Sequence, residues 1–257
     1  MIGFETVTEI PGNKAHSDQI DAMRTRYSWA EDFCRGKDVV EIACGAGIGL
    51  GLLANNAKTV IGGDVDPVVL RYGQKHYQDR NIRITHLDAC EIYLADKSVD
   101  VAICFEAIYY FPNVSDFLSE IRRILRPDGI LLCSSVNCEW HGFNPSPYSK
   151  KYYSANEMRN ELNSAGFKAE FFLGFEDNPA TFTRRVVSYI RALAVKLHLV
   201  PRTMRAKEFL KKVFYGKLES LPHEITAEHG QQHSLLKFND VEKQENYKYF
   251  YFVTHPL

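Results

Sequence analysis

The stretch Val39-Val40-Glu41-Ile42-Ala43-Cys44-Gly45-Ala46-Gly47-Ile48-Gly49 decides the fold. Its apolar first half predicts a short buried strand, and the residues that follow have the spacing of a helix. Gly45 and Gly47 let the intervening backbone approach a ligand closely, because no Cβ stands in the way. The first N–H groups of the following helix favour a carboxylate. We therefore predict a ligand site at the carboxyl end of this strand; a tight turn without a ligand is the alternative.

Strand-like and helix-like segments alternate outward from this stretch, which favours a parallel sheet covered by helices on both faces. A turn is expected at residues 126–129. The predicted fold is a doubly wound (Rossmann-like) α/β fold with a mostly parallel seven-stranded sheet and an antiparallel last strand. The predicted strands are 38–43, 59–63, 82–87, 99–105, 130–136, 167–173 and 247–254, and the predicted helices are 48–55, one that begins at Pro67, 114–125 and 155–165.

One domain is expected over residues 1–257. Residues 15–36 are expected to form an N-terminal helical segment of this domain. Residues 176–245 are too long for a plain loop and show helical periodicity at 183–199 and 203–215, so we predict a helical insertion that caps a substrate pocket. The insertion is basic, which fits either a solvated helix face or attraction to a phosphorylated acceptor or an anionic membrane surface. Its basic residues are Arg184, Arg185, Arg191, Lys196, Arg202, Arg205, Lys207, Lys211, Lys212 and Lys217.

The chain as a whole carries a net charge of −1, which gives it no strong electrostatic preference for nucleic acid. Its six cysteines form no C-x-x-C pair, and several lie in apolar runs as expected of buried, reduced thiols. Residues 1–14 lack the pattern of a signal peptide, and no apolar run reaches the length of about 20 residues that spans a bilayer. These features favour a cytoplasmic protein with at most peripheral membrane contact through the basic insertion.

Acidic residues follow the ends of the later predicted strands. Asp64 ends the second strand, where an acidic side chain can accept both hydroxyls of a ribose. Asp88 follows the third strand and can meet an adenine amino group, although a surface turn is an alternative. Glu106 follows the fourth strand. The dinucleotide pattern G-x-G-x-x-G fails, because Leu50 occupies the third glycine position.

In this order, the glycine-rich stretch, Asp64, Asp88 and the region of Phe105 resemble the motifs of class I S-adenosylmethionine (SAM)-dependent methyltransferases. The resemblance covers roughly residues 26–167. More narrowly, Arg26-Tyr27, residues 41–45, Phe105-Glu106, residues 123–129 and residues 134–137 are similar to a branch found in bacterial surface-polysaccharide biosynthesis clusters. The resemblance implies SAM as cofactor and S-adenosylhomocysteine as product, and it implies that the helical segment 15–36 closes over the cofactor. The implied cofactor-binding residues are Arg26, Tyr27, Glu41, Gly45, Ala46, Gly47, Asp64, Val65, Asp88, Ala89, Phe105 and Glu106.

This sequence departs from the branch on the side that faces the acceptor. Tyr109 and Tyr110 stand where the branch usually has Glu-His, and Ser149 stands where it has His. A sugar hydroxyl has a high pKa, so a general base is expected to help. His141, Tyr109 and Tyr110 are the candidates in that order, although both tyrosines are equally well explained by packing. No metal site is expected, because His229 and His233 lack a third ligand.

The resemblance implies methyl transfer from SAM to an oxygen of a small-molecule or glycan acceptor: a sugar of a surface polysaccharide, a nucleotide sugar or a lipid-linked intermediate. A quinone, lipid or natural product is the alternative acceptor. The loss of the Glu-His pair keeps open a SAM-binding pseudoenzyme that acts as a regulatory partner.

Overall fold

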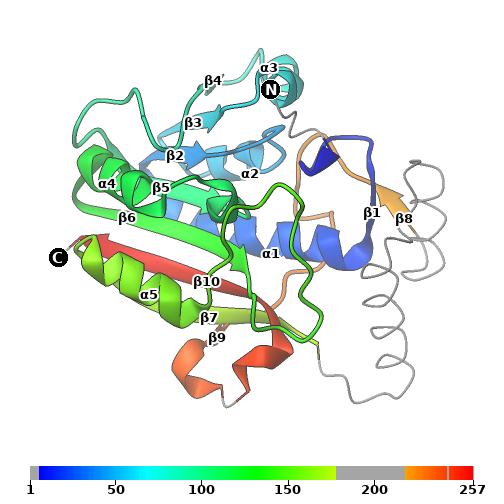
Figure 1. Ribbon diagram of the computed structural model, residues 1–257. Coiled ribbons are helices and arrows are strands. Elements are labelled where there is room, and N and C mark those ends of the chain that lie inside the picture. The colour runs from blue at the N-terminus through cyan, green and yellow to red at the C-terminus, as the bar shows by residue number, and fades with distance from the viewer. Residues whose placement is uncertain (1–5, 178–217, 242, 257) are drawn as a thin grey trace.

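A computed structural model of the chain describes residues 6–177, 218–241 and 243–256. Its main sheet has the strand order β4-β3-β2-β5-β6-β10-β7-β9. The strands from β4 to β6 are parallel, and β10 is antiparallel to both of its neighbours (Figure 1). The strands are β2 (Asp38–Ile42), β3 (Thr59–Asp64), β4 (Ile82–His86), β5 (Val99–Phe105), β6 (Leu125–Val136), β7 (Phe167–Glu176), β9 (Leu236–Lys237) and β10 (Tyr247–Pro256).

The predicted fold is therefore confirmed. All seven predicted strands are present, and within the described ranges the two-residue β9 adds an eighth at the edge next to β7. The last strand, β10, lies between β6 and β7 and pairs with each over most of its length. This arrangement makes β10 an interior strand, which explains its nearly continuous run of aromatic and β-branched residues.

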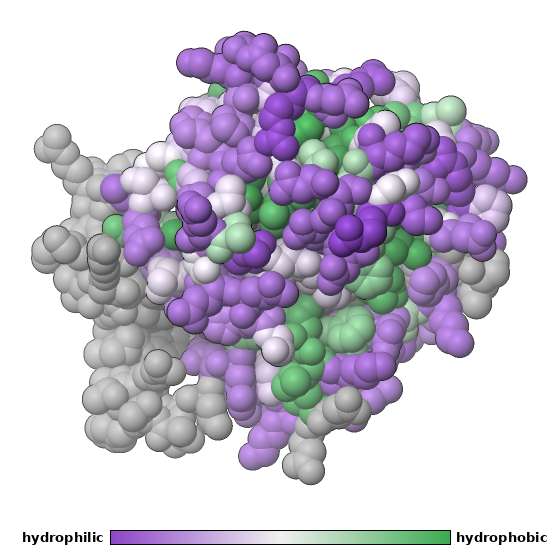
Figure 2. All heavy atoms as spheres, turned by 180° about the vertical axis from the view of Figure 1, so that it is seen from behind, coloured by the Kyte–Doolittle hydropathy of each residue, from purple (hydrophilic) through white to green (hydrophobic). Residues whose placement is uncertain are grey.

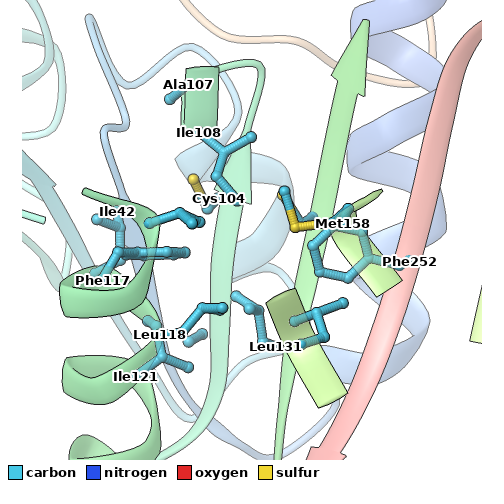
Figure 3. Packing of buried hydrophobic residues seen from close by; sticks show 14 of the residues in the cluster. Ile42, Cys104, Ala107, Ile108, Phe117, Leu118, Ile121, Leu131, Met158 and Phe252 are labelled. Atoms are coloured by element: carbon cyan, nitrogen blue, oxygen red, sulfur yellow. The ribbon is translucent and has the colours of Figure 1, made fainter. Parts of the chain in front are cut away.

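Helices cover both faces of the sheet. Two separate clusters of buried hydrophobic side chains lie on the two faces, one under α4 and α5 and the other under α1, α2 and α3. Figure 3 shows the first cluster, where Phe117 and Ile121 of α4 and Met158 of α5 lie against the sheet. The helices are α1 (Ser17–Cys34), α2 (Leu50–Ala54), α3 (Pro67–His76), α4 (Val114–Ile124) and α5 (Ala155–Ser164), and short 3-10 turns are η2 (Ile108–Tyr110), η3 (Phe238–Asp240) and η4 (Gln244–Asn246).

Local signals explain most helix starts. Pro67 begins α3 as predicted, and the side chain of Asp66 caps it by accepting from the Val68 N–H. Ser154 and Glu157 form a reciprocal capping box at the start of α5. The helix predicted at 48–55 is shorter than expected, since α2 covers only Leu50–Ala54.

The prediction of a turn at residues 126–129 is wrong, because these residues belong to strand β6 and do not separate it from α4. β6 already begins at Leu125, which pairs with Val99, and the next pair joins Val101 to Ile130. The intervening residues form an irregularity within the strand. Arg126 holds it in place through ion pairs with Asp38 and Asp100 at the starts of β2 and β5.

The described end of the 176–245 region folds back over the N-terminal part of the chain. β8 (Leu218–Ser220) pairs with β1 (Lys14–His16), and residues 221–233 continue across α2 and α1 (Figure 1). Ile225 is fully buried, and its N–H donates to the Ile48 carbonyl at 2.8 Å. Gln231 donates to Asp21 of α1 at 2.7 Å. The helices predicted at 183–199 and 203–215, with their basic residues, lie outside the described residues.

The surface opposite to the view of Figure 1 is mostly hydrophilic, and hydrophobic residues reach it in smaller areas between polar ones (Figure 2). Among the helices that the structure describes, none combines the length and the apolar character that crossing a membrane requires.

Candidate functional site

The carboxyl ends of β2, β3 and β5 open on a cavity of about 490 Å³. Residues 7–9 and helix α1 form its opposite wall. Because these strands are parallel, their ends meet at one edge of the sheet, where open α/β sheets bind ligands. Of the predicted site residues, those that line the cavity are Arg26, Tyr27, Glu41, Gly45, Ala46, Asp64, Val65, Asp88, Ala89, Phe105, Glu106, Tyr109 and Tyr110.

The loop after β2 needs its glycines for identifiable reasons. Gly45 has a φ of +57°, and a Cβ there would lie 2.8 Å from Cγ2 of Thr8. A Cβ on Gly49 would lie 1.9 Å from the Tyr27 ring, so this glycine lets α1 approach the loop. Gly47 is not part of the cavity wall. Its φ of +75° and the hydrogen bond from the Tyr77 hydroxyl to its carbonyl, at 3.0 Å, assign it to shaping the loop.

Asp64 is held rigidly at the end of β3. Its Oδ2 accepts from the Gly45 N–H and its Oδ1 from the Asp66 N–H, each at 2.9 Å. The residue is only 8% exposed, and burial raises the pKa of its carboxyl although both N–H groups act in the opposite direction. The carboxylate therefore joins the glycine loop to the start of α3 while one side of it faces the cavity.

Two charged side chains from different elements meet deep in the cavity. Glu41 of β2 is 1% exposed, and its Oε1 accepts from the Tyr27 hydroxyl at 2.7 Å. Burial raises the pKa of Glu41 to about 7, against the opposing effects of Tyr27 and Arg26. Arg26 of α1 forms an ion pair with Glu9. In both residues one buried polar atom has no hydrogen-bond partner among the residues that the structure describes: Glu41 Oε2 and Arg26 Nε.

Asp88 has a looser position at the rim. It is exposed, and its Oδ1 accepts from the Cys90 N–H at 2.8 Å in a short turn after β4. This geometry agrees with the surface-turn alternative and also leaves the carboxylate on the cavity wall.

Glu106 occupies the end of β5 in a conformation that is rare for a residue with a side chain, with a φ of +53°. Its carboxylate accepts from the Ser134 hydroxyl at 3.1 Å, and its N–H donates to the Ser134 carbonyl at 3.0 Å. Burial raises the pKa of Glu106 to about 7, while Arg26, Ser134 and Tyr109 act to lower it.

The tyrosines after β5 form an aromatic wall. Tyr109 is 7% exposed and stacks on Tyr152 with ring centroids 4.4 Å apart. Tyr110 donates to Ser146 at 3.1 Å, and the Tyr109 carbonyl accepts from the Lys150 N–H at 2.8 Å. These contacts fix the 137–154 loop against η2. The packing role expected as an alternative for both tyrosines is therefore present, and both also line the cavity.

His141 has a different position. It is exposed on the loop after β6 and is not among the residues that line the cavity. An exposed imidazole away from the pocket wall is poorly placed to take a proton from an acceptor bound there. His229 and His233 contact Thr226 and Asp21. Across residues 6–177, 218–241 and 243–256, no three His, Cys, Asp or Glu side chains converge as metal ligands would.

Several cavity residues were missed by the sequence analysis. Thr8 and Glu9 precede α1 in a segment with no recognisable motif, so only the folded chain brings them to the cavity. Tyr249 of β10 also lines it and was assigned only to the last strand. Ser134 offered a usable signal, because a hydroxyl in an otherwise apolar buried strand needs a partner.

Comparison with known proteins agrees with this geometry. Residues 40–133 match a family model described as "Methyltransferase domain". A "probable S-adenosylmethionine-dependent methyltransferase" of Mycolicibacterium smegmatis is 36% identical over 147 residues, which cover 55% of this chain and 56% of that protein. A ubiquinone biosynthesis O-methyltransferase of Pseudomonas fluorescens is 24% identical, covering 63% of this chain and 78% of the relative.

The chain spans about half the length of the first curated relatives that it matches. Among solved structures, a SAM-dependent methyltransferase from Thermotoga maritima has the same fold, with a TM-score of 0.60 at 14% identity over 93% of this chain and 91% of that chain. The chain is thus similar to SAM-dependent methyltransferases in its central region and shares their fold, and the similarity implies S-adenosylmethionine as cofactor.

Proposed function

We propose that the protein transfers a methyl group from SAM to an oxygen of a small-molecule or glycan acceptor. The observation that carries this proposal is the pair of unpartnered polar atoms, Arg26 Nε and Glu41 Oε2, in a cavity that also contains Asp64. A buried donor and a buried acceptor without partners are costly unless a ligand satisfies them.

The unpartnered atoms fit the amino-acid end of SAM. A guanidinium N–H suits its carboxylate and a carboxylate oxygen suits its ammonium group. Asp64 lies at the end of the neighbouring strand, where it would hold the ribose hydroxyls. Asp88 and Ala89 follow the next strand and would hold the adenine. The Tyr27 ring packs against Gly49 and lines the cavity together with these residues.

When bound, SAM would supply the methyl group: the acceptor oxygen forms a C–O bond to it, and the electron pair of the broken S–C bond stays on the sulfur. The chain's own task is to orient the acceptor and to exclude water. Phe105, Tyr109 and Tyr110 provide a mostly apolar wall beside Glu106 for that purpose.

The charge of the cavity favours an acceptor that is neutral at the transferred position. Among the described residues that line it, Arg26 and His16 are the basic side chains, against five carboxylates. Arg26 is already paired with Glu9. A phosphate near these carboxylates would be repelled, so any phosphorylated part of the acceptor belongs outside this part of the cavity. The carboxylates are Glu9, Glu41, Asp64, Asp88 and Glu106.

An oxygen acceptor is supported by the ubiquinone O-methyltransferase among the relatives. The glycan assignment follows from the sequence resemblance. A quinone or another flat ring is the second candidate, favoured by the aromatic side chains of Phe105, Tyr109 and Tyr110 that line the cavity.

Calorimetric titration with S-adenosylhomocysteine tests the proposal. We expect micromolar binding by the wild type and a loss of at least tenfold in Asp64→Asn, which keeps an acceptor for one of the two backbone N–H groups. Asp79→Asn, in the exposed turn after α3, is the matched control and should bind like the wild type. Folded protein without any binding would overturn the cofactor assignment. Binding without methyl transfer to any hydroxyl probe would favour the regulatory alternative.

A further inference from the structure

We infer that Glu106 is the general base that takes the proton from the acceptor hydroxyl, with Ser134 and Tyr109 as its positioning residues. This inference rests on the proposed function. It replaces His141, which lies outside the cavity, and Tyr109, whose buried hydroxyl loses a proton far less readily than a carboxyl does.

The backbone conformation of Glu106 sets the direction of its carboxylate. A left-handed residue at the end of β5 turns the chain away from the sheet, and such conformations cost of order 1–3 kcal/mol unless the surroundings impose them. Ser134 imposes it here by bonding Glu106 through both its carbonyl and its hydroxyl. A glycine would adopt this φ without strain, so the presence of glutamate points to a use for the side chain.

The surroundings of the Glu106 carboxylate leave it able to accept a proton from a group in the cavity. Glu106 is only partly buried, and it lines the cavity next to Tyr109 and Tyr110. Arg26 is the cation that acts on it, but Glu9 already neutralises this guanidinium. No described side chain forms an ion pair with Glu106 itself. The titratable groups that interact with it are Glu9 of the N-terminal segment, Arg26 of α1, Tyr109 and Tyr110 around η2, Cys133 of β6, Tyr152 of the following loop, and Tyr249 and Tyr251 of β10.

The proton balance is complete with this residue. As the acceptor oxygen forms its bond to the methyl carbon, its O–H bond breaks and the proton moves to a carboxylate oxygen of Glu106. The carboxylic acid then returns the proton to water after product release. A base with a pKa of about 7 is half ionised at neutral pH and is therefore suited to both halves of this cycle.

Three variants separate this role from cofactor binding. Glu106→Gln keeps the shape and removes the base, and Tyr109→Phe removes one hydrogen bond to it. Glu170→Gln, on the exposed surface of β7, is the matched control. Each is titrated with S-adenosylhomocysteine and assayed with radiolabelled SAM and two neutral hydroxyl probes, catechol and methyl α-D-glucopyranoside. The Glu106 carboxyl is also followed by carbon-13 NMR against pH, with Glu106→Gln identifying its resonance.

We expect Glu106→Gln to bind S-adenosylhomocysteine within about threefold of the wild type while methyl transfer falls about 10²- to 10⁴-fold. Tyr109→Phe should move the acidic limb of the pH profile upward, because the lost hydrogen bond favours the ionised form. The NMR midpoint should lie near pH 7.

An NMR midpoint near the ordinary glutamate value would overturn the inference even if neither probe is methylated. Unchanged transfer in Glu106→Gln would overturn it as well, and so would a parallel loss of S-adenosylhomocysteine binding, which would mark Glu106 as a cofactor contact. Failure of the wild type to bind S-adenosylhomocysteine would instead refute the proposed function, and the inference with it.

Discussion

The Tyr27 hydroxyl donates to Glu41 Oε1 at 2.7 Å and thereby links α1 directly to β2 in the wall of the cavity. The bond joins a helix that covers the sheet to the strand that precedes the glycine loop. The second oxygen of the carboxylate, Oε2, has no hydrogen-bond partner in the described part of the chain.

Tyr27→Phe should weaken S-adenosylhomocysteine binding about three- to tenfold at pH 7, because Glu41 loses a bond that favours its ionised form. The loss should shrink toward pH 8.5, where Glu41 is ionised in both proteins. Calorimetry at the two pH values measures this. Tyr93→Phe is the control, because it removes the hydroxyl that bonds Glu91 from a side chain that is 76% exposed. It should leave S-adenosylhomocysteine binding unchanged. A loss of affinity that does not depend on pH would mean that Tyr27 acts only by direct contact with S-adenosylhomocysteine.

Glu41→Gln should make the folded protein more stable at neutral and higher pH and should weaken its binding of S-adenosylhomocysteine. The pKa of Glu41 is raised from 4.5 to about 7 in the folded state. Its stabilising contribution is therefore complete below about pH 4.5 and is lost as the pH rises through about 7. Relative to the wild type, the variant should gain up to about 3 kcal/mol between pH 5 and pH 8. Urea unfolding at both pH values tests this.

The same variant should bind S-adenosylhomocysteine about 10- to 100-fold more weakly, because a charge-assisted hydrogen bond to the ammonium group is lost. A stability difference that does not depend on pH would show that Glu41 titrates normally.

Gly45→Ala and Gly36→Ala form a matched pair of substitutions. Both glycines have left-handed φ values, but a Cβ on Gly36 meets nothing within 4 Å whereas one on Gly45 lies 2.8 Å from Thr8. Gly36→Ala should therefore cost only the backbone strain, about 1 kcal/mol. Gly45→Ala should cost more and abolish S-adenosylhomocysteine binding. Equal losses of stability, measured by thermal unfolding, would show that Thr8 moves aside freely.

Glu106→Gly should stabilise the protein while it removes activity. Glycine relieves the left-handed backbone and removes a partly buried carboxylate with a raised pKa. We expect a gain of about 1 kcal/mol or more at pH 8. Lys97→Gly relieves a similar φ of +50° at an exposed position and gives the contribution of backbone relief alone. A less stable Glu106→Gly protein would mean that the Ser134 hydrogen bond outweighs the strain.

Much of this architecture could be predicted because strand and helix periodicities are strong in the parallel half of the chain. Asp64 was placed correctly at a strand end since apolar runs mark where such strands stop. The structure at 126–129 could not be predicted, because Pro-Asp-Gly is typical of turns and the ion pairs of Arg126 with Asp38 and Asp100 are non-local.

The catalytic side of the cavity was harder to predict for the same reason. His141 was chosen for its chemistry, but nothing in the local sequence reveals that its loop turns the ring outward. The importance of Glu106 depends on Ser134, which lies 28 residues away along the chain. Contacts of this kind follow from tertiary packing and leave no periodic signal.

The position of β10 has a consequence for how the chain folds while it is being synthesised. β10 lies between β6 and β7, and both neighbours emerge from the ribosome before it does. Until residues 247–256 are synthesised, the edges of β6 and β7 that β10 will join are unpaired, and each is able to pair with a foreign strand. Protection of these edges during synthesis, by a chaperone or by slow collapse of α5 onto the gap, is therefore part of what this fold requires.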